Sequence, residues 1–103
     1  MDTEKLDRRI DILRPVASQN ELGEVQYQYV LDARVSAQVL PIGGRETFMA
    51  SQIVPEALFK IRIRYRSAIT PAHKVVYQSA TYDIAHIAEI GRRQGLELLV
   101  KFP

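Results

Sequence analysis

The stretch 58-LFKIRIRYR-66 decides the fold class of this chain. In it, the apolar side chains Phe59, Ile61, Ile63 and Tyr65 alternate strictly with cations. Those cations are Lys60, Arg62, Arg64 and Arg66, here called the basic stripe. Successive side chains of a strand point to opposite faces of its sheet, so this period of two predicts a half-buried strand. Its apolar face belongs in a core, and its basic face cannot lie there.

The same alternation continues toward the N-terminus. Residues 9–14 and 24–30 predict a long β-hairpin, joined by a polar turn in which Gly23 takes a positive φ. Pro15 is expected to end the first strand or to lie at its edge. Residues 34–40 predict a third strand, with Asp32 and Ala33 as a tight connection before it. The valines and tyrosines of 24–30 are expected to belong to the core or to the edge of the hairpin.

Toward the C-terminus, residues 73–78, 81–90 and 96–102 predict three more strands. Ser79 and Ala80 form the expected turn between the first two. The alternation within 81–90 changes phase, which predicts a bulge near Ala85 and His86. The basic segment 91–95 is expected to be a flexible turn.

These patterns predict an all-β fold, a small barrel of about six to seven antiparallel strands with one long loop carrying at most a short helix. One hundred and three residues suit one core, so residues 1–103 are expected to form a single domain. Hydrophobic residues make up 47% and charged residues 25%, which excludes wholesale disorder. Neither a secretory signal nor a membrane-spanning run is expected.

No catalytic, cofactor-binding or metal-binding residue is expected. The absence of cysteine excludes disulfides, thiol nucleophiles and thiolate zinc sites. His73 and His86 have no carboxylate or second histidine at metal-ligand spacing, and no serine lies in a nucleophile-elbow motif. His86 is expected to be structural and His73 exposed. A net charge of +2 does not indicate a dedicated nucleic-acid binder.

The basic stripe has two possible explanations. Arginine forks suit phosphates or the acidic residues of a partner, so the stripe is a candidate assembly or DNA-facing surface. Alternatively, it is a solvated face whose charges are balanced by acidic residues on neighbouring strands.

The second candidate is the segment 42–55, which has no clean strand pattern. One or two helical turns are possible over 45–51. The segment is too apolar for an idle loop, and it is expected to be either a lid on the barrel or a mobile arm that packs on another subunit. The residues that make it a candidate mobile assembly loop are Gly43, Gly44, Arg45, Glu46, Phe48, Met49, Ile53 and Val54.

Several motifs in a fixed order define a resemblance over nearly the whole chain. They are Leu6 with residues 9–12, Gly23 and Glu24, residues 35–39 with 43–46, residues 60–66 with Ile69, Val76 and Tyr77, residues 82–84 with Ile87, and residues 96–98. The chain resembles the bacteriophage head–tail joining family, the head–tail adaptor or head-closure proteins of tailed phages. Ser36 departs from the pattern, because the family often has tryptophan there.

The resemblance implies a non-enzymatic virion protein at the head–tail connector, present in the bacterial host cytoplasm during assembly or when expressed from a prophage. Such proteins form a ring under the portal and adaptor, close the DNA-filled head and provide the tail attachment surface. The implied partners are further copies of the chain, the portal or adaptor, and a tail-completion or tail-tube protein, with no membrane. The free chain is expected to be a monomer or weak oligomer. Contact with the DNA end remains open.

Two alternatives also remain open at this point. One is a tail-completion or neck protein that caps the tail tube. The other is a small nucleic-acid-binding β-barrel.

Overall fold

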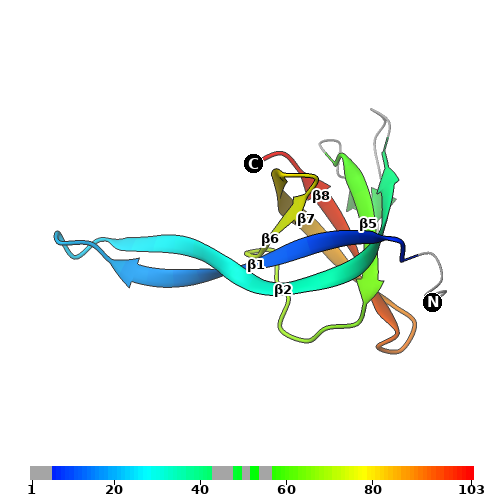
Figure 1. The fold of residues 1–103 in the computed structure, drawn as a ribbon, viewed down its shortest axis with the longest axis horizontal. Coiled ribbons are helices and arrows are strands. Elements are labelled where there is room, and N and C mark those ends of the chain that lie inside the picture. The colour runs from blue at the N-terminus through cyan, green and yellow to red at the C-terminus, as the bar shows by residue number, and fades with distance from the viewer. Residues whose placement is uncertain (1–5, 43–47, 50–51, 54–56) are drawn as a thin grey trace.

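The computed structural model describes residues 6–42, 48–49, 52–53 and 57–103, and these residues form strands and turns (Figure 1). The strands are β1 (Arg8–Gln19), β2 (Val25–Pro41), β3 (Phe48–Met49), β4 (Gln52–Ile53), β5 (Phe59–Arg64), β6 (Lys74–Tyr77), β7 (Ala80–Ile90) and β8 (Gly95–Lys101). The described part of the chain has no helix long and apolar enough to cross a membrane.

Six of these strands close into a barrel in the order β1-β2-β5-β8-β7-β6. Every neighbouring pair is antiparallel, including the closing pair of β1 with β6. This confirms the prediction of an all-β barrel of about six to seven strands. Closure pairs β1 with β6, so the sheet has no terminal strand.

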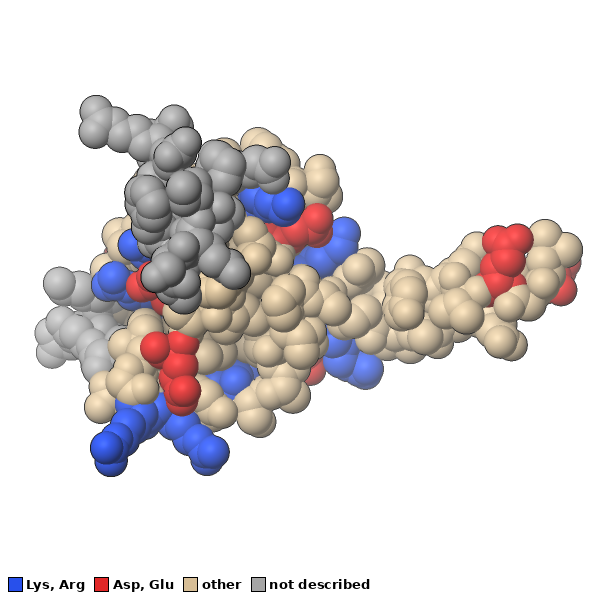
Figure 2. Space-filling view, turned by 180° about the vertical axis from the view of Figure 1, so that it is seen from behind, with Lys and Arg blue, Asp and Glu red and all other residues tan. Residues whose placement is uncertain are grey.

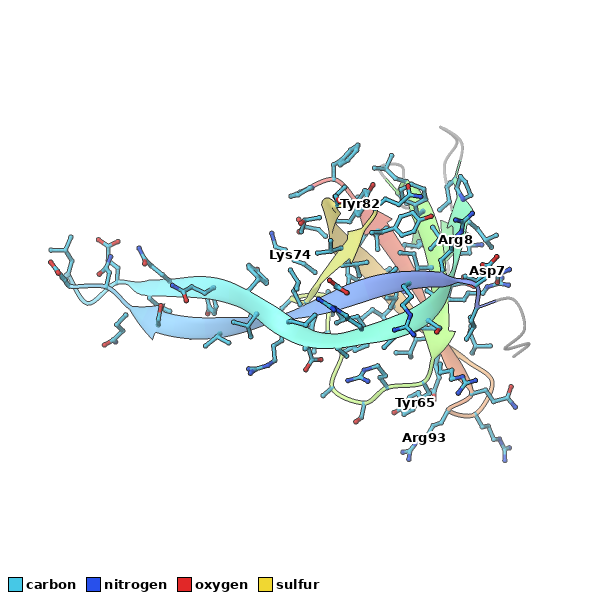
Figure 3. The ribbon with its side chains drawn as sticks, in the orientation of Figure 1. Asp7, Arg8, Tyr65, Lys74, Tyr82 and Arg93 are labelled. Atoms are coloured by element: carbon cyan, nitrogen blue, oxygen red, sulfur yellow. The ribbon has the colours of Figure 1, made fainter. Side chains whose placement is uncertain are left out.

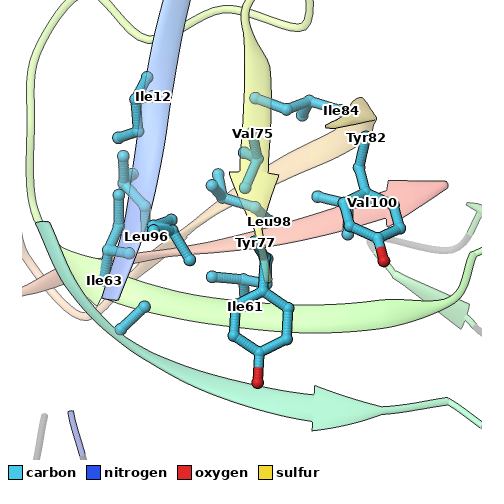
Figure 4. Close-up of a cluster of buried hydrophobic side chains, with 12 residues drawn as sticks. Ile12, Ile61, Ile63, Val75, Tyr77, Tyr82, Ile84, Leu96, Leu98 and Val100 are labelled. Atoms are coloured by element: carbon cyan, nitrogen blue, oxygen red, sulfur yellow. The ribbon is translucent and has the colours of Figure 1, made fainter. Parts of the chain in front are cut away.

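Alternating side chains fill the interior of the barrel, as the pattern of β5 predicts. Ile61 and Ile63 are fully buried, whereas Lys60, Arg62 and Arg64 lie on the outside. Burying a side chain of this size contributes roughly 1.5–3 kcal/mol. The core cluster consists of Ile10, Ile12, Ala37, Ile61, Ile63, Val75, Tyr77, Tyr82, Ile84, Leu96, Leu98 and Val100 (Figure 4).

The predicted second and third strands are one continuous strand, β2, so the tight connection expected at Asp32 and Ala33 is wrong. Ile12 pairs with Ala33, but the next residue of β1, Leu13, pairs with Leu31. Asp32 is therefore the extra residue of a β-bulge. A bulge changes the phase of the alternation in the same way as a short turn between two strands.

The expected end of the first strand at Pro15 is also wrong, because β1 continues to Gln19. Pro15 pairs with Tyr29 of β2. On its other side, β1 pairs with β6 only from Asp11 to Leu13, so Pro15 lies on an open edge. A missing backbone N–H is tolerated at such an edge.

The turn between β1 and β2 confirms the expected role of Gly23, whose φ is +80°. The Asn20 side-chain oxygen accepts hydrogen bonds from the backbone N–H groups of Leu22 and Glu24, both at 2.9 Å. The backbone N–H of Gly23 donates to the Asn20 carbonyl at 3.0 Å. These bonds fix a tight reversal at the tip of the hairpin.

The bulge predicted in β7 is confirmed. Ile84 pairs with Val100 and His86 with Leu99, which leaves Ala85 as the extra residue. The turn before β7 is shifted by one residue from the prediction. Its central residues are Gln78 and Ser79, with φ of 50° and 65°, and Tyr77 pairs with Ala80 across it.

His73 is buried, so the expectation that it is exposed is wrong. Its Nδ1 lies 3.2 Å from the backbone nitrogen of Thr70, which donates to it. The backbone N–H of His73 in turn donates to the Thr70 carbonyl at 3.0 Å. The ring therefore braces the turn that leads into β6.

Candidate functional site

The basic stripe divides into parts with different environments. Lys60, Arg62 and Arg64 project from the outer face of β5, while Arg66 follows the end of this strand. Glu97 of β8 pairs in register with Arg62. The Arg62 Nε donates to Glu97 Oε2 at 2.9 Å, and Lys60 Nζ lies 3.9 Å from Glu97 Oε1. For Lys60 and Arg62 the geometry therefore favours a face whose charges are balanced by an acidic residue of the neighbouring strand over a surface free to contact another molecule.

The other two members of the stripe differ from this pair. Arg66 Nη2 lies 3.9 Å from Asp32 Oδ2, and its Nε is buried without a hydrogen-bond partner among the described residues. Arg66 also lines an open hollow with Tyr65 and Ser67. Arg64 is exposed, and no ion-pair partner for it lies in the described part of the chain. Arg64 is therefore the member of the stripe best placed to meet another molecule.

Arg64 lies beside the turn between β7 and β8, which carries two more exposed arginines, Arg92 and Arg93. In this turn the Arg93 backbone N–H donates to Glu89 Oε1 at 3.0 Å. The Arg93 guanidinium carbon lies 6.0 Å from the centre of the Tyr65 ring (Figure 3). We call Arg64, Arg92 and Arg93 the basic end of the barrel. Sequence reasoning treated the 91–95 turn as flexible and did not join it to the stripe.

Only part of the 42–55 segment can be compared with the predictions. Phe48 pairs with Ile53 and Met49 with Gln52, so the helical turn considered for Phe48 and Met49 is wrong. Gly43, Gly44, Arg45, Glu46 and Val54 lie outside the described residues. Whether the segment is a lid or an assembly arm stays a prediction.

The two ends of this segment lie on the outer surface of the barrel. Leu99 points outward from β8, yet it is fully buried in a small cluster with Ala57. Ile42, Ala85 and Ala88 pack against this cluster. The chain on both sides of the segment is therefore anchored against the wall formed by β7 and β8.

The long hairpin predicted from residues 9–14 and 24–30 is confirmed, but the projection of its outer part, residues 14–31, from the barrel as a two-stranded arm was not predicted. It extends from the barrel as the long blue and cyan hairpin of Figure 1. The molecule accordingly measures 47 Å along its longest axis and 27 Å along the other two. Sequence reasoning placed the tyrosine-rich face of 24–30 in the core or at a hairpin edge. These residues are exposed, so the core interpretation is wrong.

The arm exposes apolar side chains along one face. Leu22 at the tip is 82% exposed, Val25 58% and Tyr27 64%, and Tyr29 and Leu31 continue the row. In register with this row on β1 lie Leu13, Pro15, Ala17 and Gln19, so this face of the arm is largely uncharged. Soluble monomers rarely display a continuous apolar face of this kind without a partner. The sequence signal that could have indicated a projecting arm is the length of the predicted hairpin, whose strands are longer than those that form the rest of the barrel wall.

The charge of the arm differs from that of the rest of the chain. From Pro15 to Leu31 the only charged side chains are those of Glu21 and Glu24, both near the tip of the arm (Figure 2). Residues 15–31 thus carry −2, and the rest of the chain, including Arg14 at the base of the arm, carries +4. The basic end lies on the barrel, away from the tip of the arm: the labelled Arg93 is at the lower edge of the barrel in Figure 3. Each molecule is therefore electrostatically polar along its length.

Contacts at the base of the arm fix its direction. Asp32, the bulge residue, lies 4.0 Å from Arg14 of β1 and 3.9 Å from Arg66. Lys74 of β6 lies over the Tyr29 ring at 4.6 Å and pairs with Asp83 at 3.3 Å. Through these contacts the arm is tied to β6, β7 and the loop after β5. These contacts fix the direction in which the arm projects from the barrel.

The described residues hold no group of three or more His, Asp or Glu side chains that could bind a metal ion. His73 braces a turn, and the carboxylates of Asp11, Asp32, Asp83 and Glu97 face cations. The functional candidates in the described part of the chain are therefore surfaces: the arm and the basic end.

Comparison with known proteins gives a match to one family and matches to several solved structures. The model of the family described as phage head completion protein matches residues 1–102. The solution structure of protein SF1141 from Shigella flexneri 2a has a TM-score of 0.75 at 18% identity, covering 99% of this chain and 96% of that one. A chain from the virion of a native gene transfer agent particle has a TM-score of 0.66 at 17% identity, covering 92% of each chain. The chain matches no curated protein.

Proposed function

The chain belongs to the phage head completion protein family, and from this premise we propose that it forms a ring under the portal and adaptor, closes the DNA-filled head and provides the surface to which the tail attaches. Membership makes it a non-enzymatic structural component of a virion-like particle. The ring, its position and its role in tail attachment are the proposal.

The observation that carries the proposal is the exposed arm. The barrel closes on itself and buries its own core, so it needs no partner to fold. The arm, by contrast, displays Leu22, Val25 and Tyr27 to solvent. A subunit with a self-sufficient barrel and a projecting apolar arm is suited to heterologous contacts, which generate rings when the rotation closes. The polarity of the molecule supports the same type of contact.

A deletion experiment tests the position of the chain in the particle. In phage or particle production lacking this gene, we expect DNA-filled heads that fail to join tails and lose their DNA, restored by the gene in trans. Antibody labelling of tail-less heads from a tail-deficient strain should mark one vertex. Label on free tails and none on heads would contradict the head position and favour a tail-completion protein that caps the tube.

A binding assay tests the DNA alternative. We expect little retention of double-stranded DNA by the free chain at physiological salt, because the arginines of the basic end are few and specific binders make many phosphate contacts. Binding that survives physiological salt would favour a nucleic-acid-binding barrel or a direct contact with the DNA end.

A further inference from the structure

We infer that the arm of one copy of this chain docks on the barrel of the next copy, with its acidic tip against the basic end formed by Arg64, Arg92 and Arg93. This inference rests on the proposed ring and names the contact that builds it. The apolar face of the arm is thus covered by a second copy of the chain, and successive copies are joined head to tail.

The first argument is the open edge of the arm. On the side away from β1, β2 pairs with β5 only from Ala37 to Pro41, so its edge over residues 25–36 is unpaired within the described structure. Residues 25–31 of this edge contain neither proline nor a charged residue. Natural sheets protect exposed edges with such residues, because an uncharged β-prone edge pairs with other chains. The missing protection indicates that the edge is covered in the working assembly.

The second argument is charge complementarity. Glu21 and Glu24 are exposed at the tip, and no cation lies between Pro15 and Leu31. The exposed arginines of the basic end lie on the barrel, away from the arm tip, where Figure 3 labels Arg93. Because the arm points away from the basic end of its own barrel, these opposite charges meet only between copies. Complementary charges of this kind fix the register of an interface and steer the encounter.

The third argument is reach. The arm strands run from Arg14 to Gln19 and from Val25 to Val30, which at about 3.3 Å per residue gives an arm of roughly 20 Å including the turn. The molecule is 27 Å across its two short axes. An arm of this length spans most of the width of a neighbouring barrel. Its apolar row can therefore be covered while its tip reaches the basic end.

The chain has no cysteine, so single introduced cysteines can trap this contact. Leu22→Cys marks the tip and retains both glutamates, and Gln94→Cys marks the basic end and retains its arginines. Thr81→Cys is the matched control, an exposed position of β7 beside Tyr82 and away from the basic end. Equimolar mixtures of purified full-length variants at high concentration are oxidised, and heterodimers are counted by mass. Disulfide trapping accumulates even a weak complex.

We expect Leu22→Cys to couple with Gln94→Cys at least tenfold faster than with Thr81→Cys, and this preference to shrink in 1 M salt. Equal rates with both acceptors would overturn the inference. A dominant tip-to-tip homodimer of Leu22→Cys would also overturn it, because that contact is isologous.

A charge exchange provides a second, independent measurement. Glu21→Lys with Glu24→Lys in the Leu22→Cys chain should lower the coupling rate at least fivefold. Arg92→Glu with Arg93→Glu in the Gln94→Cys chain should restore it. Loss without restoration would overturn the assigned acceptor. All four positions are exposed, so folding is expected to be retained and is checked by circular dichroism.

These outcomes are separate from those of the proposed function. A chain that labels head vertices but shows no preferred tip-to-basic-end coupling would retain its place in the particle and lose this contact. A chain that couples as expected but labels free tails would retain the contact and lose the head position.

Discussion

At the scale of single residues, Glu97 decides what the basic stripe does. One carboxylate faces two cations from the neighbouring strand, and its side chain is only 18% exposed. A partly buried carboxylate needs partners, and Arg62 and Lys60 provide them. Arg62→Glu would therefore place a second carboxylate beside Glu97 and destabilise the fold. If this variant failed to assemble, the failure would not show whether a contact surface or the fold itself had been lost. Arg64, Arg92 and Arg93 are the appropriate positions for testing assembly.

We predict that Glu97→Gln lowers the free energy of unfolding by about 1 kcal/mol. Hydrogen bonds to charged groups contribute roughly 1.5–3 kcal/mol, and the partial exposure of Arg62 reduces this value. Urea unfolding measures the change. Arg64→Gln, which changes the exposed cation that follows Arg62 in the basic stripe, is the control and should stay within about 0.5 kcal/mol of the wild type. Equal losses in the two variants would mean that the Glu97 contacts add nothing to stability.

At the scale of elements, the arm is a two-stranded ribbon without a core of its own. Isolated hairpins are marginally stable in water. This one is continuous with β1 and β2 of the barrel, and its base is tied by Asp32, Arg66 and Lys74. The bulge at Asp32 interrupts the ladder where the arm leaves the barrel wall, and bulges increase local twist and bend strands. The barrel thus determines the direction of the arm, while the exposed face of the arm remains free for a partner.

We predict that replacing residues 16–28 with Asn-Gly leaves the barrel folded. Pro15 and Tyr29 form a register pair, and a two-residue Asn-Gly turn suits such a closure. No residue of the core cluster lies in the replaced segment, so the melting temperature should change by less than about 4 °C. The radius of gyration should fall from 14.5 Å toward about 13 Å.

The control for this replacement is Ile61→Ala, which empties part of the core. Truncation of a buried isoleucine costs about 2–5 kcal/mol and should lower the melting temperature by roughly 10 °C or more. If the arm replacement destabilised the barrel as much as this core variant, the arm would be part of the folding unit and not an appended contact element.

At the scale of the whole molecule, the two proposed contact surfaces lie on different parts of it, the projecting arm and the turn between β7 and β8. Heterologous contacts of this kind require each subunit to offer one surface and accept another. A ring therefore closes only if every member has both. This requirement gives a prediction for mixtures of intact and defective chains.

We predict that the chain with residues 16–28 replaced by Asn-Gly interferes with assembly when it is co-expressed with the wild type. It accepts an arm at its basic end but offers none, so it interrupts the ring. Adding Arg92→Glu and Arg93→Glu to the same variant should remove most of the interference, because it then neither offers nor accepts. The yield of tailed particles measures both effects. Equal interference by the two variants would contradict a head-to-tail ring.

The sequence by itself determined the barrel. Alternation in β5, β7 and β8 reports directly which side chains face the core, because the period of two is a local property of the strand. The bulge at Ala85 was also predictable, since the shift in phase occurs within one strand. The family could be inferred in the same way, from motifs in a fixed order along the chain.

Only the tertiary structure decided which part of the predicted hairpin lies outside the barrel. The pattern of Val25, Tyr27 and Tyr29 is the same whether the row faces a core or solvent, because alternation shows that two faces differ but not what covers the apolar one. The pairing of Glu97 with Arg62 and the joining of Arg64 to Arg92 and Arg93 depend on strand order and register. Strand order and register are set by contacts between residues distant in sequence. Because of them, Lys60 and Arg62 of the basic stripe are balanced by Glu97, whereas Arg64 belongs to the basic end.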